Sequence, residues 1–220
     1  NSSKNRLLLI TEKDNWNLKT TIAFRKCLER SSYTPEFVSL HYSAADKPYW
    51  FRQNAWKFFL DTHSDADIFA VIDDDSCLLD SVRHTDLLTS SASASAGGQQ
   101  LPPRLIVHGL ETPLNTVVPN GHKTFTQFVP KAMGMAFKAH FMTDFPISFW
   151  REMLPDFRAW AVSHTLNETL HPSIDAQHDQ LARALESMSR QGGLSEFNLI
   201  FHFAYFDEKW HDRYDWRLAP

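Results

Sequence analysis

Three consecutive carboxylates, Asp73, Asp74 and Asp75, follow directly after the short apolar run Ile68–Ile72. Like charges this close repel one another, and a cation bound among them removes that cost. Side chains alternate along an extended chain, so Asp73 and Asp75 point to one side and Asp74 to the other. One side therefore offers two carboxylates to a hard divalent ion, Mg²⁺ or Mn²⁺, which prefers oxygen ligands. The alternative is an acidic turn that is only solvated.

The elements that must position these acids follow a β-α-β-α-β order. Strands are predicted at residues 6–12, 36–42 and 68–72, with helices at about 18–30 and 49–61 between them. This order predicts an α/β fold with a mostly parallel central sheet flanked by helices. The acids then lie at the carboxyl end of a buried strand, where open α/β sheets bind their ligands.

The second half of the chain is predicted to be mainly helical. A strand at 105–108 is followed by helices around 149–154, over 173–190 and over 195–206, the last buried because its apolar residues surround it. A single helical turn is expected at 85–88, and residues 89–103 are expected to be a mobile surface loop because they are rich in Ser, Ala and Gly. The aromatic and charged tail, residues 210–218, is expected to pack over a cleft.

Length and composition fit a single packed domain over residues 1–220. The formal charge of −4 gives no overall attraction to nucleic acid. No apolar stretch reaches the length of a membrane span, and no signal peptide is visible. The abrupt start at Asn1 leads us to expect a trimmed catalytic domain. The cytoplasm and the Golgi lumen both stay open, because two cysteines and one Asn-Glu-Thr triplet at Asn167 do not decide the compartment.

The order and spacing of these motifs resemble the metal-dependent, nucleotide-sugar-using glycosyltransferases with the A-type fold. The residues that carry the resemblance span nearly the whole chain, and the acid triplet is the most specific of them: Ile10-Thr11-Glu12, Arg52-Gln53 with Lys57, Val71 to Asp75, Met142 to Pro146 with Trp150-Arg151, Ser195-Glu196-Phe197, His202, and Tyr214-Asp215-Trp216. The match looks closest to compact glycosyltransferase domains of bacteria, algae and large algal viruses.

The resemblance implies a division of labour between two halves of the chain. Residues 1–110 would bind the nucleotide sugar, and residues 111–220 would bind the acceptor and supply the base. The metal, Mn²⁺ or Mg²⁺, would be bound directly by Asp75, while Asp73 would contact the ion or the ribose. The remaining nucleotide contacts would come from Thr11, Glu12, Asp74, Arg52 and Lys57, although a solvated helix face explains Arg52 at least as well.

A late histidine and a carboxylate complete the site that the resemblance implies. His202 would be a third metal ligand; the alternative is a core histidine hydrogen-bonded to a carbonyl, and His211 is the fallback ligand. Glu196, just after the helix cap Ser195, would be the catalytic base, although stabilisation of the helix N-terminus explains it equally well. Asp144 is the rival base, or else a helix cap. Four tryptophans are candidates for stacking on sugar rings: Trp150, Trp160, Trp210 and Trp216.

The expected function is transfer of a sugar from a UDP- or GDP-type donor to a hydroxyl of a glycan or glycoprotein, with inversion if Glu196 or Asp144 is the base. A sugar-phosphate nucleotidyltransferase is the first alternative. It usually needs a Gly-rich basic loop after the first strand, and this chain has Thr11-Glu12-Lys13-Asp14-Asn15 instead. A non-catalytic carbohydrate-binding module is the second alternative, and it is disfavoured by the long α/β pattern.

Overall fold

The computed structural model describes residues 6–12, 34–40, 49–71, 83–89, 102–111, 128–143, 146–190 and 195–220, with the backbone alone for 6–12, 34–40, 49–50 and 84. Contacts between residues divide the chain into two compact units, residues 1–45 and 46–220. The two units are therefore described one at a time. The predicted functional division near residue 110 is a different one and stays a prediction.

The first unit contains two parallel strands, β1 (Arg6–Glu12) and β2 (Thr34–Leu40). They pair along their whole length, from Arg6 opposite Thr34 to Glu12 opposite Leu40. Parallel neighbours need a crossover connection, as the β-α-β pattern predicts. The helix predicted at about 18–30 lies outside the described residues. β2 begins and ends two residues before the predicted strand at 36–42.

The second unit opens with α2 (Tyr49–Lys57), the short 3₁₀ helix η2 (Leu60–Thr62) and β3 (Ile68–Val71). β3 pairs with β5 (Ile147–Trp150) in antiparallel fashion, with Ile68 opposite Trp150 and Val71 opposite Ile147. Two of the three ladders in the described part of the chain are parallel, and this one is not. The described strands form an α/β arrangement of three two-stranded ladders.

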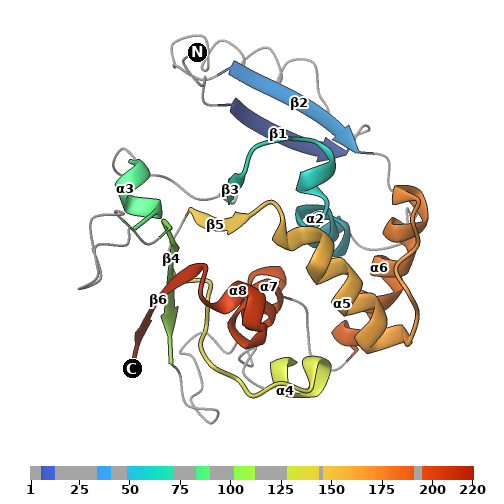
Figure 1. The fold of residues 1–220 in the computed structure, drawn as a ribbon. Coiled ribbons are helices and arrows are strands. Elements are labelled where there is room, and N and C mark those ends of the chain that lie inside the picture. Colours follow the sequence, from blue (N-terminus) through green and yellow to red (C-terminus); the bar gives the residue numbers. More distant parts are fainter. Residues whose placement is uncertain are drawn as a thin grey trace. The chain divides into compact units, whose positions relative to one another are not determined.

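A third ladder joins β4 (Leu105–Leu110) to β6 (Tyr214–Ala219), which run parallel side by side (Figure 1). The prediction that the tail packs over a cleft did not foresee this strand. Gly109 of β4 lies against β6 and the segment around Ala139, because a Cβ built on it would be 2.8 Å from Leu218 Cδ2 and 3.1 Å from Ala139 Cβ. The short helix α3 (His84–Leu87) precedes β4 and covers the turn predicted at 85–88 to within one residue.

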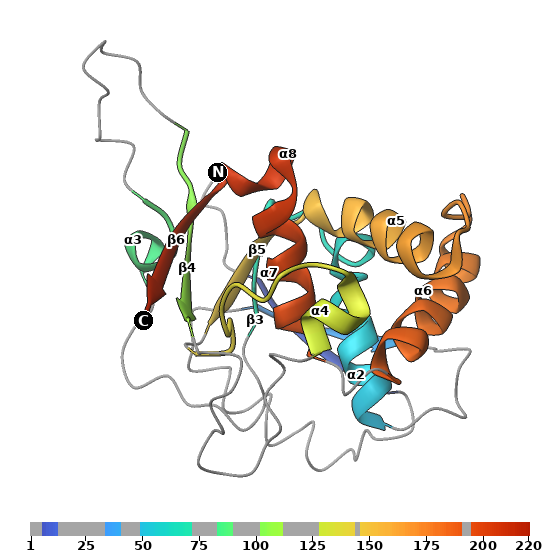
Figure 2. The same cartoon turned by 90° about the horizontal axis from the view of Figure 1, so that it is seen from below.

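The remaining helices are α4 (Phe128–Met133), α5 (Met153–Leu166), α6 (Ile174–Ser189), α7 (Glu196–Phe206) and α8 (Glu208–His211). α5 and α6 pack against each other at one side of this unit and lie side by side in both views (Figures 1 and 2). The predictions for α6 and α7 are correct to within one residue at each end. α7 is buried from Glu196 to Ala204, as its continuous apolar surface predicts.

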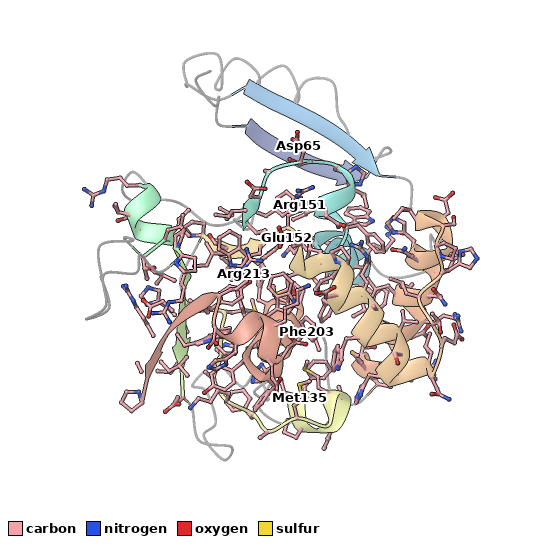
Figure 3. All side chains as sticks on the ribbon, viewed as in Figure 1. Asp65, Met135, Arg151, Glu152, Phe203 and Arg213 are labelled. Carbon is pink, nitrogen blue, oxygen red and sulfur yellow. The ribbon has the colours of Figure 1, made fainter. Side chains whose placement is uncertain are left out.

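The helix predicted around 149–154 is wrong at its start, because residues 147–150 form β5. The helix begins only at Met153, and Pro155 lies inside its first turn rather than after its end. Proline is tolerated in the first turn, where its missing N–H has no helical partner. Next to this helix start, an ion pair links the end of β5 to the beginning of β6. Glu152 and Arg213 form it at 2.8 Å and lie close together in Figure 3.

Candidate functional site

The N-terminus of α7 carries a buried carboxylate that is paired with a lysine from α2. The Glu196 residue is 5% exposed, and its Oε1 accepts a hydrogen bond from Lys57 Nζ. The lysine side chain is itself 14% exposed, and its ammonium lies 4.4 Å from the centre of the Phe197 ring. An ammonium over an aromatic face is attracted by the ring's quadrupole. Glu196 and Lys57 therefore form one enclosed charged pair that joins α2 to α7.

Ser195 caps α7, as predicted, and its hydroxyl also begins a polar network. Ser195 Oγ accepts from the backbone N–H of Asn198 and from Asn198 Nδ2, the latter at 2.8 Å. Asn198 Oδ1 accepts from Phe141 N at 2.9 Å, which fixes the orientation of the amide. Asn198 Nδ2 must then donate to His140 Nδ1, 3.2 Å away. The segment 140–142 is thereby held against the start of α7.

His202 lies one turn beyond Asn198 on the same face of α7. Its Nε2 accepts from the backbone N–H of Lys138 at 3.0 Å, so this nitrogen carries no proton. Its Nδ1 must therefore donate to Asn198 O at 2.7 Å. Burial lowers the pKa of His202 to about 4, and the nearby His140 contributes to the lowering, against the effect of the Asn198 carbonyl.

These contacts favour the alternative interpretation, in which His202 is a core histidine hydrogen-bonded to a carbonyl. The side chain is fully buried and both ring nitrogens already have partners. A metal at Nε2 would have to displace the Lys138 N–H. Glu196 and His202 do not share a face of α7 either, because a step of six residues along a helix turns the two side chains about 120° apart. The metal site proposed below therefore omits His202.

The strand that leads to the acid triplet ends beside the start of β5. Val71, its last residue, is paired with Ile147, and Asp73 follows two residues later in the sequence. On the β5 side of the ladder, Asp144 directly follows Thr143 and lies two residues before Pro146 in the sequence. Residue 142 returns to α7, since Ser195 Oγ donates to Met142 Sδ at 3.1 Å. A chain of contacts thus links the end of β3 to the helix that carries Glu196.

Several predicted site residues cannot be placed in this way. Asp73, Asp74, Asp75 and Asp144 lie outside the described residues. Thr11 and Glu12 are the last two residues of β1, in the separate first unit, with only their backbone described. Arg52 is half-buried on α2, and Lys57, five positions later, lies about 140° away from it around the helix. They do not share a face.

The tryptophans expected to stack on sugars divide into two pairs. Trp210 and Trp150 are buried, and their indole N–H groups donate to Asp156 Oδ2 and to Arg213 O respectively. Trp160 and Trp216 are half-buried. Trp160 stacks on His164 with ring centres 5.0 Å apart, and Trp216 packs against Tyr205 and donates to His211 O. His211, the fallback ligand, uses Nδ1 with Tyr205 O.

Asn198, His140 and Lys138 were not singled out from the sequence. Asn198 had a detectable signal: it is a polar residue in an apolar helix, three residues after Ser195 and four before His202, so all three share one face. His140 and Lys138 had none, because nothing local marks the segment that packs on that face. Burial also lowers the pKa of His140, partly offset by the hydrogen bond from Asn198.

Within the described ranges, no three His, Cys, Asp or Glu side chains come together as a metal site. None of the described helices has the length and apolar character needed to span a membrane. Comparisons of the chain with known protein families, with curated proteins and with solved structures find no match. The function is therefore argued from the contacts of this chain alone.

Proposed function

We propose that this protein is a metal-dependent glycosyltransferase that moves a sugar from a nucleoside-diphosphate donor of UDP or GDP type to a hydroxyl of a glycan or glycoprotein. Glu196 is the base that we assign to the reaction, with Asp144 as the rival. The proposal rests on the acid triplet after β3 and on the buried carboxylate at the start of α7.

One observation of the structure carries most of the support. The pairing of Val71 with Ile147 and the contact of Met142 with Ser195 connect the end of β3 to the N-terminus of α7. In the sequence, Asp73 to Asp75 follow Val71, Asp144 lies between Met142 and Ile147, and Glu196 follows Ser195, so each acid is close along the chain to a residue of this connection. An acidic metal site together with a separate carboxylate base is what the proposed reaction requires.

The residues have separate roles in the proposed transfer. Glu196 takes the proton of the acceptor hydroxyl, and the acceptor oxygen bonds to the anomeric carbon as the bond from that carbon to the diphosphate breaks. The nucleoside diphosphate leaves with the electron pair of the broken bond. Asp73 and Asp75, whose oxygen donors suit Mn²⁺ and Mg²⁺, would hold a divalent ion, which would neutralise negative charge on the departing diphosphate. Attack from the face opposite the diphosphate gives inversion.

A screen of nucleotide sugars with and without Mn²⁺ tests the proposal. We expect release of free UDP or GDP from at least one donor, and we expect EDTA to remove that release. Asp75→Ala should abolish the release while the circular dichroism spectrum stays that of the native chain. Asp67→Ala is the matched control, because Asp67 lies just before β3, where its side chain is 86% exposed.

Two other results would replace the proposal. Release of pyrophosphate from a nucleoside triphosphate and a sugar phosphate would favour a nucleotidyltransferase. Sugar binding without any affinity for nucleotides, measured by calorimetry, would favour a carbohydrate-binding module.

A further inference from the structure

We infer that Lys57 is a positioning residue for the carboxylate of Glu196 and not a ligand of the nucleotide. This inference rests on the proposed function and changes the role that the resemblance implied for Lys57. The side chains that carry it, Lys57, Glu196 and Phe197, are all described.

The surroundings of Lys57 favour a partner within the protein. Its ammonium donates to Glu196 Oε1 and lies over the ring of Phe197, so the first two residues of α7 both contact it. Only 14% of the lysine side chain and 7% of the glutamate side chain are exposed. A phosphate bound at Lys57 would compete with Glu196 for the ammonium, and loss of the pair would leave the Glu196 carboxylate buried without its cation.

The pair can control where the carboxylate points. A glutamate side chain has three rotatable bonds, and a base must be held within hydrogen-bond distance of the proton that it removes. The Lys57 contact at Oε1 fixes one oxygen and leaves Oε2 as the atom that can accept the acceptor's proton. The Phe197 ring in turn fixes the ammonium. Lys57 thus acts on the reaction through Glu196.

The test compares Lys57→Met, Glu196→Gln and the double variant in turnover and in binding of UDP and GDP with Mn²⁺. A general base contributes about 10²- to 10⁴-fold to a rate, and misplacing a reacting group costs on the order of 10²-fold. We expect Lys57→Met to lower kcat by about 10²-fold with the Kd for the nucleotide unchanged. The double variant should be no slower than Glu196→Gln alone, because residues that act as a unit are not additive.

Opposite outcomes overturn the inference. A raised Kd for UDP or GDP in Lys57→Met, or losses in kcat that multiply in the double variant, would make Lys57 an independent ligand. If Lys57→Met fails to fold, Lys57→Arg decides: it keeps the charge but moves it, so we expect a lower kcat, a shifted pH profile and an unchanged Kd. An unchanged kcat in a folded Lys57→Arg variant with unchanged pH profile would contradict the inference.

A matched control is Lys209→Met, which removes a Lys–carboxylate pair with Asp156 whose lysine is 61% exposed. We expect its kcat and Kd to stay those of the native protein. Failure of the proposed function itself has a different signature, since the unmodified protein would then neither bind UDP or GDP with Mn²⁺ nor release them from a sugar donor.

Discussion

Two charged pairs join the region around α2 to its neighbours, and they are built differently. At the α5 junction, both terminal nitrogens of Arg158 contact Asp61, at 2.6 and 2.9 Å, and one of them also donates to Phe58 O. At the α7 junction, Lys57 contacts Glu196 through a single ammonium. A guanidinium fork holds a carboxylate in one geometry, whereas an ammonium is a point charge on a flexible stem.

This difference separates a structural pair from one that can take part in chemistry. Asp61 has both oxygens occupied by Arg158, so it has little left to offer a substrate. Among the described residues, Lys57 holds Glu196 at Oε1 alone, at the start of a helix, where the dipole also favours its negative charge. We therefore expect changes at Asp61 to affect mainly stability, and changes at Glu196 to affect mainly activity.

The largest expected effect is the loss of the α5 junction. Asp61→Ala leaves the Arg158 guanidinium buried, with the residue 2% exposed, and without its counter-charge. Removing one partner of a buried pair costs about 3–5 kcal/mol, which urea unfolding monitored by tryptophan fluorescence would measure. Asp67→Ala, which removes a 3.8 Å contact with Arg151 at an exposed position, should cost under about 1 kcal/mol. Equal losses in the two variants would contradict the comparison.

Acid should also weaken the packing of α7 around His202. Its pKa in the folded protein is about 4, below the ordinary value of 6.5, so the unfolded chain takes up this proton first as the pH falls. The free energy of unfolding is therefore lost between about pH 6.5 and pH 4, by about 3 kcal/mol in total. Urea unfolding at several pH values would show a steeper loss in the native protein than in His202→Gln. Parallel curves would mean that His202 does not titrate in this range.

A smaller effect is expected when Lys57 alone is removed. Lys57→Met leaves the buried Glu196 carboxylate without its cation, although the N-terminus of α7 compensates part of the charge, and we expect a loss of about 1–3 kcal/mol. Adding Glu196→Gln removes the uncompensated charge, so the double variant should be more stable than Lys57→Met. Urea midpoints of the two variants measure the difference. A double variant less stable than Lys57→Met would show that the glutamate stabilises the fold independently of the lysine.

The smallest effect belongs to an exposed pair with the same fork geometry as Arg158. Arg183 contacts both oxygens of Glu168 at 2.8 and 2.7 Å, but its side chain is 54% exposed. Exposed pairs typically contribute about 0.2–1 kcal/mol. Arg183→Met should therefore shift the urea midpoint only slightly, and a loss comparable to that of Asp61→Ala would show that geometry outweighs burial.

Local patterns in the sequence were enough for some of these features. Ser195 before a run of apolar residues predicted both the cap and the buried helix, because capping and burial depend on near neighbours. The alternation of residues 214–218 is also a strand pattern. Its partner strand, β4, is far away in sequence, so the local pattern alone does not reveal the pairing. The helix predicted to reach residue 61 ends at Lys57. Asp61 instead contacts Arg158, at a separation of 97 residues.

The candidate site shows the same limit more strongly. Glu196 and Lys57 were each selected from the sequence, yet their contact joins residues 139 apart and nothing local predicts it. His202 was selected because a buried polar ring needs a partner, and that argument was sound. Its partners are the backbone N–H of Lys138 and the backbone carbonyl of Asn198, which no side-chain pattern reveals. The chemistry inferred from the residue types stays a prediction, whereas the pairings come only from the fold.

Gly109 allows its neighbours in the second unit to pack closely against β4. A methyl group there would press on Leu218 and Ala139 at once, and on Phe141 Cδ1 at 3.1 Å. Phe141 N donates to Asn198, and Asn198 Nδ2 donates to Ser195, the N-cap of α7. Crowding at residue 109 would therefore be transmitted to the N-terminus of α7. A graded series of side chains at this one position, from alanine to valine, would thus move the helix start by small steps without altering any charge.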